Sequence, residues 1–128
     1  MTEHAAKTVA LIAHDNKKET MIAFVSAHRD VLARYHLIAT GTTGGLIQER
    51  CDLTVTRMLS GPIGGDAQIA AQVAEGKVAA VFFFIDPLGA HPHDPDINTL
   101  LRICNVHNVP LATNPATAAY IIAADKAL

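Results

Sequence analysis

The segment LSGPIGGDAQIA, residues 59–70, places three glycines and a proline before a single acid, Asp66, at the start of a helical pattern. An aspartate at a helix start is commonly an N-cap, and this alternative stays open. A cap needs only one ordinary turn, whereas these glycines, beginning with Gly61, let backbone amides and Ser60 approach a bound group. A carboxylate held beside that group and away from water suits a general base. We therefore hypothesise that Asp66 is such a base.

The segment ATGTTGG, residues 39–45, combines three threonines and three glycines between a predicted strand and a predicted helix. Glycine lets the backbone come close to a ligand, and exposed N–H groups at a helix start bind anions. The hydroxyls of Thr40, Thr42 and Thr43 can add hydrogen bonds to a phosphate. A capped turn with Thr43 as the N-cap is the structural alternative. The spacing matches neither of the common nucleotide-binding fingerprints.

The segment AHDNKK, residues 13–18, ends a strand-like run with His14 and Asp15 and then turns basic. Lys18 can supply a point charge to a phosphate. A helix start capped by Asp15 or Asn16 explains the same run, so the pattern alone leaves both interpretations open.

The segment FFFIDPLGAHPHDPD, residues 82–96, is rich in titratable side chains, namely Asp86, His91, His93, Asp94 and Asp96. A metal-dependent hydrolase is one interpretation, but no cysteine accompanies these residues and HxHDxD is not a specific metal spacing. A histidine oriented by a carboxylate is favoured: His93, with Asp94 or Asp96, can polarise a carbonyl or carry a proton. Asp96 is alternatively the N-cap of the following helix.

Strand-like apolar runs alternate with helical patterns along the whole chain. Strands are predicted over residues 8–13, 36–40, 53–59, 78–85 and 109–113. Helices are predicted from Met21 to Leu32, after GTTGG as far as Cys51, over 66–75, around 97–104 and over 115–127. This order predicts an α/β fold, a single-domain three-layer αβα sandwich with a mostly parallel, doubly wound sheet. Ligands in such folds bind beyond the carboxyl ends of the strands, where all four segments lie.

The composition predicts one globular domain spanning residues 1–128. Half of the residues are apolar and 17% are charged, which excludes a disordered chain. The net charge of −2 provides no general attraction to nucleic acid or to an anionic membrane, and the longest apolar run is too short to span a bilayer. The N-terminus lacks a secretory signal, and Cys51 and Cys104 are predicted to be free thiols. These features favour a cytoplasmic protein.

Together, the four segments and VPLATNPATA resemble the methylglyoxal synthase family, in the same order and spacing from about Val9 to Ile122. The pair GPxGGD and DPLxxxPHDPD is highly specific for that family. The resemblance implies a lyase that converts dihydroxyacetone phosphate into methylglyoxal and inorganic phosphate without a metal or organic cofactor. It also implies a homo-oligomer, typically a hexamer, that phosphate commonly inhibits. Effector-binding domains of large carbamoyl phosphate synthetases share the fold but lack the acid and the histidine.

The resemblance also implies a role for each matching residue. Asp66 corresponds to the base, and His93 lies at the carbonyl end of the substrate. The residues that match the substrate and phosphate contacts are His14, Lys18, Thr40, Thr42, Thr43, Ser60 and Gly61. The supporting polar residues are Asp15, Asp86 and Asp96, and Arg102 matches an arginine of the helix after PHDPD. The alternative function is a non-catalytic domain that binds a phosphorylated effector and regulates a partner.

Overall fold

A five-stranded, fully parallel sheet forms the centre of the computed structural model, which describes residues 7–89 and 94–124, with the backbone alone described at 94–96. The strands are β1 (Thr8–Ala13), β2 (His36–Ala39), β3 (Val55–Arg57), β4 (Ala80–Phe84) and β5 (Leu111–Ala112). Their order in the sheet is β3-β2-β1-β4-β5, and every neighbouring pair is parallel. The predicted doubly wound parallel sheet is confirmed.

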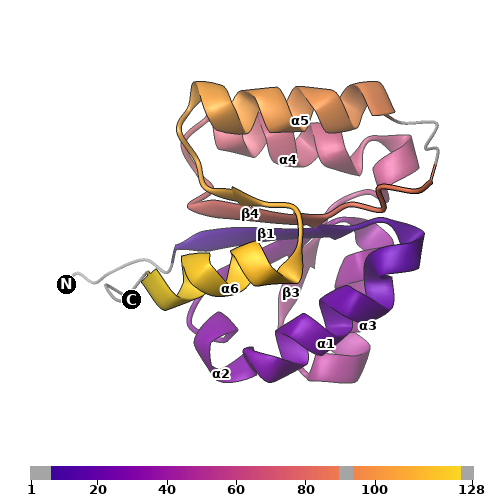
Figure 1. Cartoon of the computed structure of the whole chain (residues 1–128), viewed down its shortest axis with the longest axis vertical. Helices are drawn as coiled ribbons and strands as arrows, with labels where there is room; N and C mark the ends of the chain where they lie inside the picture. The colour runs from indigo at the N-terminus through magenta and orange to yellow at the C-terminus, as the bar shows by residue number, and fades with distance from the viewer. Residues whose placement is uncertain (1–6, 90–93, 125–128) are drawn as a thin grey trace.

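Helices cover both faces of the sheet (Figure 1). One face carries α1 (Lys18–Ala27), α2 (Arg29–Leu32), α3 (Gly41–Cys51) and α6 (Pro115–Ala124). The other face carries α4 (Gly65–Ala74) and α5 (Asp94–Val106). Two short 3₁₀ turns, η1 (Asp15–Lys17) and η2 (Gly61–Ile63), lead into α1 and α4. Because right-handed crossovers place helices on both faces, the interior strands are apolar on both sides.

The core consists of two apolar clusters separated by the sheet, because successive side chains of a strand point to opposite faces. On β4, Phe82 and Phe84 pack on the α1 side, and Phe83 packs on the α4 side. Phe24 of α1 meets Phe82 and Phe84 edge to face, at centroid separations of 5.8 and 5.5 Å. Burying each large apolar side chain contributes about 1.5–3 kcal/mol. This packing holds β1 and β4, whose carboxyl ends carry the site.

The first helix predicted from the sequence is in fact two helices. The pattern from Met21 to Leu32 predicted one continuous face, but α1 ends at Ala27 and α2 begins at Arg29. His28 lies at the break with φ −114° and ψ 24°, outside the helical range, and its ring contacts that of Phe24 in a tilted arrangement, with centroids 4.5 Å apart. The apolar spacing is retained across the break, which is why the sequence pattern did not reveal it.

The helix starts decide the capping alternatives. Helix α3 begins at Gly41 with Thr40 in the N-cap position, so the predicted start after GTTGG is wrong and Thr43 is not a cap. Gly64 occupies the N-cap position of α4, so Asp66 is the second helical residue and not its cap. Helix α5 begins at Asp94, so Asp96 is not its N-cap.

The segment 13–18 likewise lacks the predicted caps. The N-cap positions of η1 and α1 are taken by His14 and Lys17, not by Asp15 or Asn16. The C-terminal helix, in contrast, starts as predicted: Pro115 is the first residue of α6, and the Asn114 Oδ1 accepts a hydrogen bond from the Thr117 amide at 2.9 Å.

Both cysteines are buried free thiols on helices, as predicted, Cys51 at the end of α3 and Cys104 in α5. Burial raises the pKa of the Cys104 thiol to about 11, so this group stays protonated at neutral pH. Within the described residues, no helix has the length and apolar character needed to cross a bilayer.

Candidate active site

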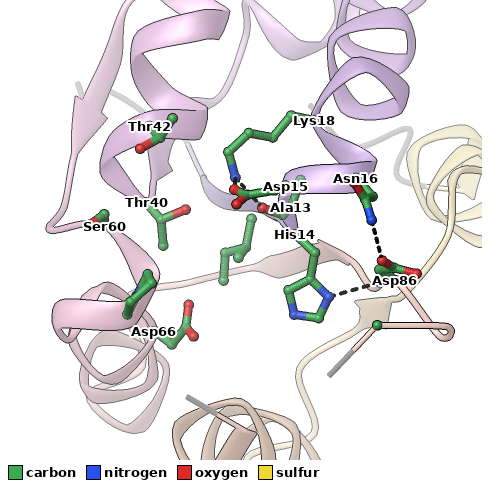
Figure 2. Close-up of a pocket in the computed structure, with 14 residues that line it drawn as sticks. Ala13, His14, Asp15, Asn16, Lys18, Thr40, Thr42, Ser60, Asp66 and Asp86 are labelled. Atoms are coloured by element: carbon green, nitrogen blue, oxygen red, sulfur yellow. Dashed lines mark hydrogen bonds and ion pairs between the residues drawn. The ribbon is translucent and has the colours of Figure 1, made fainter. Parts of the chain in front are cut away.

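A cavity of about 570 Å³ opens at the carboxyl ends of the strands (Figure 2). It lies beside β1 and β4, where the strand order reverses direction, which is the usual ligand position in doubly wound sheets. Its walls come from β1, the loop after β4 and the starts of η1, α3, η2 and α4. The lining residues are Ile12, Ala13, His14, Asp15, Asn16, Lys18, Thr40, Thr42, Ser60, Gly61, Pro62, Asp66, Asp86 and Gly89.

The start of α3 forms one wall of this cavity. The first turn of a helix has amides without a carbonyl partner within the helix, and the amide of Gly44 is the first to bond back, to the Thr40 carbonyl at 2.8 Å. The Gly41 amide donates instead to the Leu59 carbonyl at 3.1 Å. The amides of Thr42 and Thr43 are therefore the ones that a ligand can use, next to the Thr40 and Thr42 side chains at the cavity wall. This is an anion-binding arrangement.

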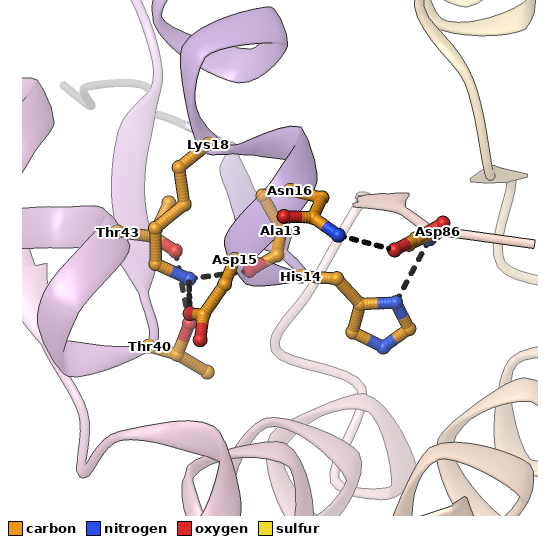
Figure 3. A network of polar contacts seen from close by, with 8 residues as sticks. All are labelled: Ala13, His14, Asp15, Asn16, Lys18, Thr40, Thr43 and Asp86. Atoms are coloured by element: carbon orange, nitrogen blue, oxygen red, sulfur yellow. Dashed lines mark hydrogen bonds and ion pairs between the residues drawn. The ribbon is translucent and has the colours of Figure 1, made fainter. Parts of the chain in front are cut away.

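Lys18 adds a positive charge to the same space. Its Nζ donates to the Ala13 carbonyl at 2.7 Å and lies 3.2 Å from Asp15 Oδ1 (Figure 3). The Lys18 side chain is only 16% exposed, whereas that of Asp15 is 98% exposed. Because an exposed carboxylate is largely screened by water, Asp15 holds the ammonium in place more than it neutralises it.

Asp66 enters the cavity from the opposite side, as the second residue of α4, and is fully buried. In Figure 2 its carboxylate points into the space below Thr40 and Ser60. Burying a charged carboxylate costs several kcal/mol of folding free energy unless hydrogen bonds or an opposite charge compensate it. Such a group in a ligand cavity is therefore a candidate for catalysis.

His14 and Asp86 connect the ends of β1 and β4. The Asp86 amide donates to His14 Nδ1 at 2.9 Å, so a neutral His14 ring carries its proton on Nε2. The Asp86 carboxylate accepts from Asn16 Nδ2 at 2.9 Å (Figure 3). It also accepts from the Leu88 amide at 3.0 Å. Both residues are buried. Asp86 therefore orients the histidine and holds the loop that follows β4.

Most residues predicted for the site line this one cavity, although they come from four separate segments. Those at the wall are His14, Asp15, Lys18, Thr40, Thr42, Ser60, Gly61, Asp66 and Asp86. Thr43 is fully buried instead and lies behind Thr40, whose hydroxyl is 3.4 Å from its own. Arg102 is exposed on α5 and is not part of the cavity wall. His93 and the side chain of Asp96 lie outside the described residues.

Asn16 was considered from the sequence only as a possible cap, yet it lines the cavity and bonds Asp86. Its place two residues after His14, just beyond the end of β1, was the only available signal. The described part of the chain contains no group of three or more His, Cys, Asp or Glu side chains arranged to hold a metal ion. The predicted cluster of His91 and His93 falls outside that part.

The fold and the cavity define an α/β domain built for a small anionic ligand. The family model of the MGS-like domain matches residues 20–113. The methylglyoxal synthase of Thermus thermophilus is 63% identical over 117 residues, which cover 91% of this chain and 93% of that protein. The methylglyoxal synthase of Carboxydothermus hydrogenoformans is 61% identical over 86% of this chain and 91% of its own length.

A crystal structure of methylglyoxal synthase from Elizabethkingia anophelis has a TM-score of 0.89, with 44% identity, and the match covers 94% of this chain and 79% of that one. The chain therefore belongs to the methylglyoxal synthase family of enzymes. The resemblance inferred from the sequence motifs is confirmed.

Proposed function

We propose that this chain converts dihydroxyacetone phosphate into methylglyoxal and inorganic phosphate, with Asp66 as the general base. The observation that carries the proposal is the burial of Asp66 in the same cavity as Lys18 and Thr40. A domain that only senses a phosphorylated effector gains nothing from a carboxylate beside its anion. The cavity volume of about 570 Å³ suits a small ligand.

The phosphate of the substrate binds at the start of α3. The amides of Thr42 and Thr43 and the positive end of the helix dipole attract it, and Lys18 adds a point charge. The hydroxyls of Thr40, Thr42 and Ser60 and the Gly61 backbone complete the contacts. The buried Thr43 hydroxyl supports Thr40 from behind.

Asp66 then removes a proton from the hydroxymethyl carbon next to the carbonyl. Positioned general-base catalysis contributes about 10²- to 10⁴-fold. Negative charge develops on the carbonyl oxygen, which accepts hydrogen bonds from Nε2 of His14 and, by correspondence with the family, from His93. A donor aimed at such an oxygen is worth about 10²-fold or more in rate.

The resulting enediol expels phosphate when the C–O bond to the ester oxygen is perpendicular to the plane of the enediol, where it overlaps the π system. As that bond breaks, the enediol loses the proton of its terminal hydroxyl, which becomes the aldehyde oxygen. The enol that forms becomes methylglyoxal by gaining a proton on its CH2 carbon and losing the proton of its remaining hydroxyl. The phosphate contacts fix the torsion of the breaking bond, so that elimination prevails over reprotonation. Asp15 and Asp86, and Asp96 by correspondence with the family, support these groups without taking part in the proton transfer. Arg102, exposed on α5 and outside the cavity wall, has no part in these steps within one chain.

We further propose that residues 1–128 form one domain and that the protein is a cytoplasmic homo-oligomer, a hexamer by resemblance to the family. We also propose that no metal or organic cofactor takes part in the reaction. Exposed apolar side chains support association: Leu88 is 95% and Ile63 is 66% exposed. Exposed apolar surface of this kind commonly marks contacts between proteins. A monomer in light scattering of the purified protein would contradict the oligomer.

Replacing Asp66 by Asn tests the proposed base. We expect Asp66→Asn to lower kcat by about 10³-fold, because the amide cannot accept the proton. Binding of inorganic phosphate, measured by calorimetry, should be retained. Asp30→Asn on the exposed end of α2 is the matched control and should leave turnover unchanged. Activity follows from colorimetric detection of methylglyoxal formed from dihydroxyacetone phosphate.

Near-normal turnover of Asp66→Asn would remove Asp66 as the base. An unchanged protein that binds phosphate but forms no methylglyoxal would favour the non-catalytic sensor instead.

A further inference from the structure

The main chain of Leu59 contacts three residues, which belong to the two helices α3 and α4. Its amide donates to the Gln68 Oε1 of α4 at 2.7 Å. Its carbonyl accepts from the Gly41 amide, the first residue of α3, at 3.1 Å. The same carbonyl lies against Gly65 so closely that a Cβ there would overlap the oxygen and lie 2.9 Å from the carbonyl carbon. Leu59 therefore connects the starts of α3 and α4.

These two helix starts carry the residues proposed for phosphate binding and for general-base catalysis, respectively. Gly41 is followed by Thr42 and Thr43, whose amides are proposed to bind the phosphate, and Gly65 is followed directly by Asp66. The next residue after Leu59 is Ser60, whose carbonyl accepts from the Gly65 amide at 3.0 Å. The separation between the base and the phosphate contacts is therefore set through the main chain of residues 59–60.

Gln68 is the side chain that holds this main chain from outside the cavity. Residues of a helix advance by about 100° each, so Gln68 points away from the direction of Asp66, two residues earlier. Gln68 is accordingly exposed, and it is not part of the cavity wall. A direct contact with substrate is excluded by this placement.

We infer that Gln68 is a positioning residue: by holding the Leu59 main chain against Gly41 and Gly65, it fixes Asp66 relative to the phosphate-binding turn of α3. This inference rests on the proposed function. A hydrogen bond at the surface contributes little to folding, because water replaces it easily. Catalysis is far more sensitive, since a displacement of about 1 Å can lower a rate by about 10²-fold.

Three variants test the inference. Gln68→Met removes the acceptor at nearly constant size, and Gln68→Glu keeps an acceptor oxygen. Gln48→Met is the matched control, because exposed Gln48 also makes one bond to a main-chain group, the Val55 carbonyl at 3.1 Å, away from the cavity.

We expect Gln68→Met to lower kcat for methylglyoxal formation by about tenfold, with a smaller change in KM, because the base is held less well than the phosphate. Gln68→Glu should restore kcat to within about threefold, and Gln48→Met should behave as the unchanged protein. Amide hydrogen exchange supplies a readout that does not need turnover: the Gly41 amide should exchange about tenfold faster in Gln68→Met alone.

Unchanged kcat in Gln68→Met, or unchanged exchange at Gly41, overturns the inference. A loss of thermal stability equal in Gln68→Met and Gln48→Met, with equal turnover, also overturns it, because the bond would then be structural only. If the unchanged protein forms no methylglyoxal, the proposed function fails by itself. Faster exchange at Gly41 then still supports the link from Gln68 to α3, and unchanged exchange overturns that link too.

Discussion

The two glycine-rich turns of the site differ in what their glycines touch. In the first turn, Gly41 lies against the main chain of residues 58–60, but Gly44 and Gly45 lie against the side chain of Arg57, where an added Cβ would be 2.9 Å from its Cγ and 3.1 Å from its Cζ, respectively. In the second turn, Gly65 lies against the main chain of Leu59. Arg57 is an exposed side chain, held by a bond from its Nε to the Gly41 carbonyl at 2.9 Å, whereas the Leu59 carbonyl is held between two helix starts.

This difference indicates that the two halves of the site tolerate change unequally. A side chain can take another rotamer when a neighbour grows, at a cost of about 1 kcal/mol. A main-chain group held between two helix starts cannot move without displacing the elements that it contacts. The turn that presents Asp66 is therefore the stricter at Gly65, and the turn proposed to bind phosphate has room to vary at Gly44 and Gly45.

The largest effect is expected for Gly65→Ala. The new Cβ must push α4 away from Leu59, which lowers the free energy of unfolding by about 3 kcal/mol and displaces Asp66. We expect kcat to fall by about 10²-fold or more in the protein that folds. Denaturant unfolding and the methylglyoxal assay measure the two effects. Wild-type turnover in a stable variant would show that the Leu59 contact does not set the position of the base.

A smaller effect, of a different kind, is expected for Thr42→Val. The change keeps the shape of a side chain at the cavity wall but removes one hydrogen bond to a charged group, worth about 1.5–3 kcal/mol. KM and the inhibition constant of inorganic phosphate should therefore rise about tenfold or more, while kcat changes less. If kcat falls while phosphate binding persists, the assignment of phosphate binding to the α3 turn and of the base to the α4 turn is wrong.

The smallest effect is expected for Gly45→Ala. Its Cβ meets only the far end of Arg57, and alanine is favoured over glycine inside a helix by about 1 kcal/mol. We expect unchanged turnover, within about twofold, and a slightly higher melting temperature. A loss of activity comparable to that of Gly65→Ala would remove the contrast between the turns.

Strands and helices with strong periodic patterns were predictable from the sequence. The run VAAVFFFI predicted a strand apolar on both faces, and β4 is such a strand, between β1 and β5. The start of α3 was not predictable, because glycines disfavour a helix by local propensity. Tertiary contacts reverse that preference: a Cβ on Gly41 would be 3.1 Å from the Met58 carbonyl, and its amide bonds Leu59.

The site was predicted as a set of residues, not as an arrangement. Strand ends identified Lys18, Thr40 and Asp66 as neighbours, because parallel strands place their carboxyl ends on one edge. The bond between the Asp86 amide and the His14 ring joins residues 72 positions apart, and no local pattern encodes such a pair. The same holds for the bond from Leu59 to Gln68, whose partner was part of a helix with no assigned role.

The sequence by itself determined the order of strands and helices, the family and the kinds of groups at the sheet edge, because apolar periodicity and turn chemistry are local properties. Only the tertiary structure decided that Thr43 lies behind Thr40 and that Asp66 is a buried helical residue rather than a cap. It also decided that the main chain of Leu59 lies between the starts of α3 and α4 and contacts both. Those outcomes depend on packing between segments distant in sequence, where ångström-scale contacts outweigh local preference.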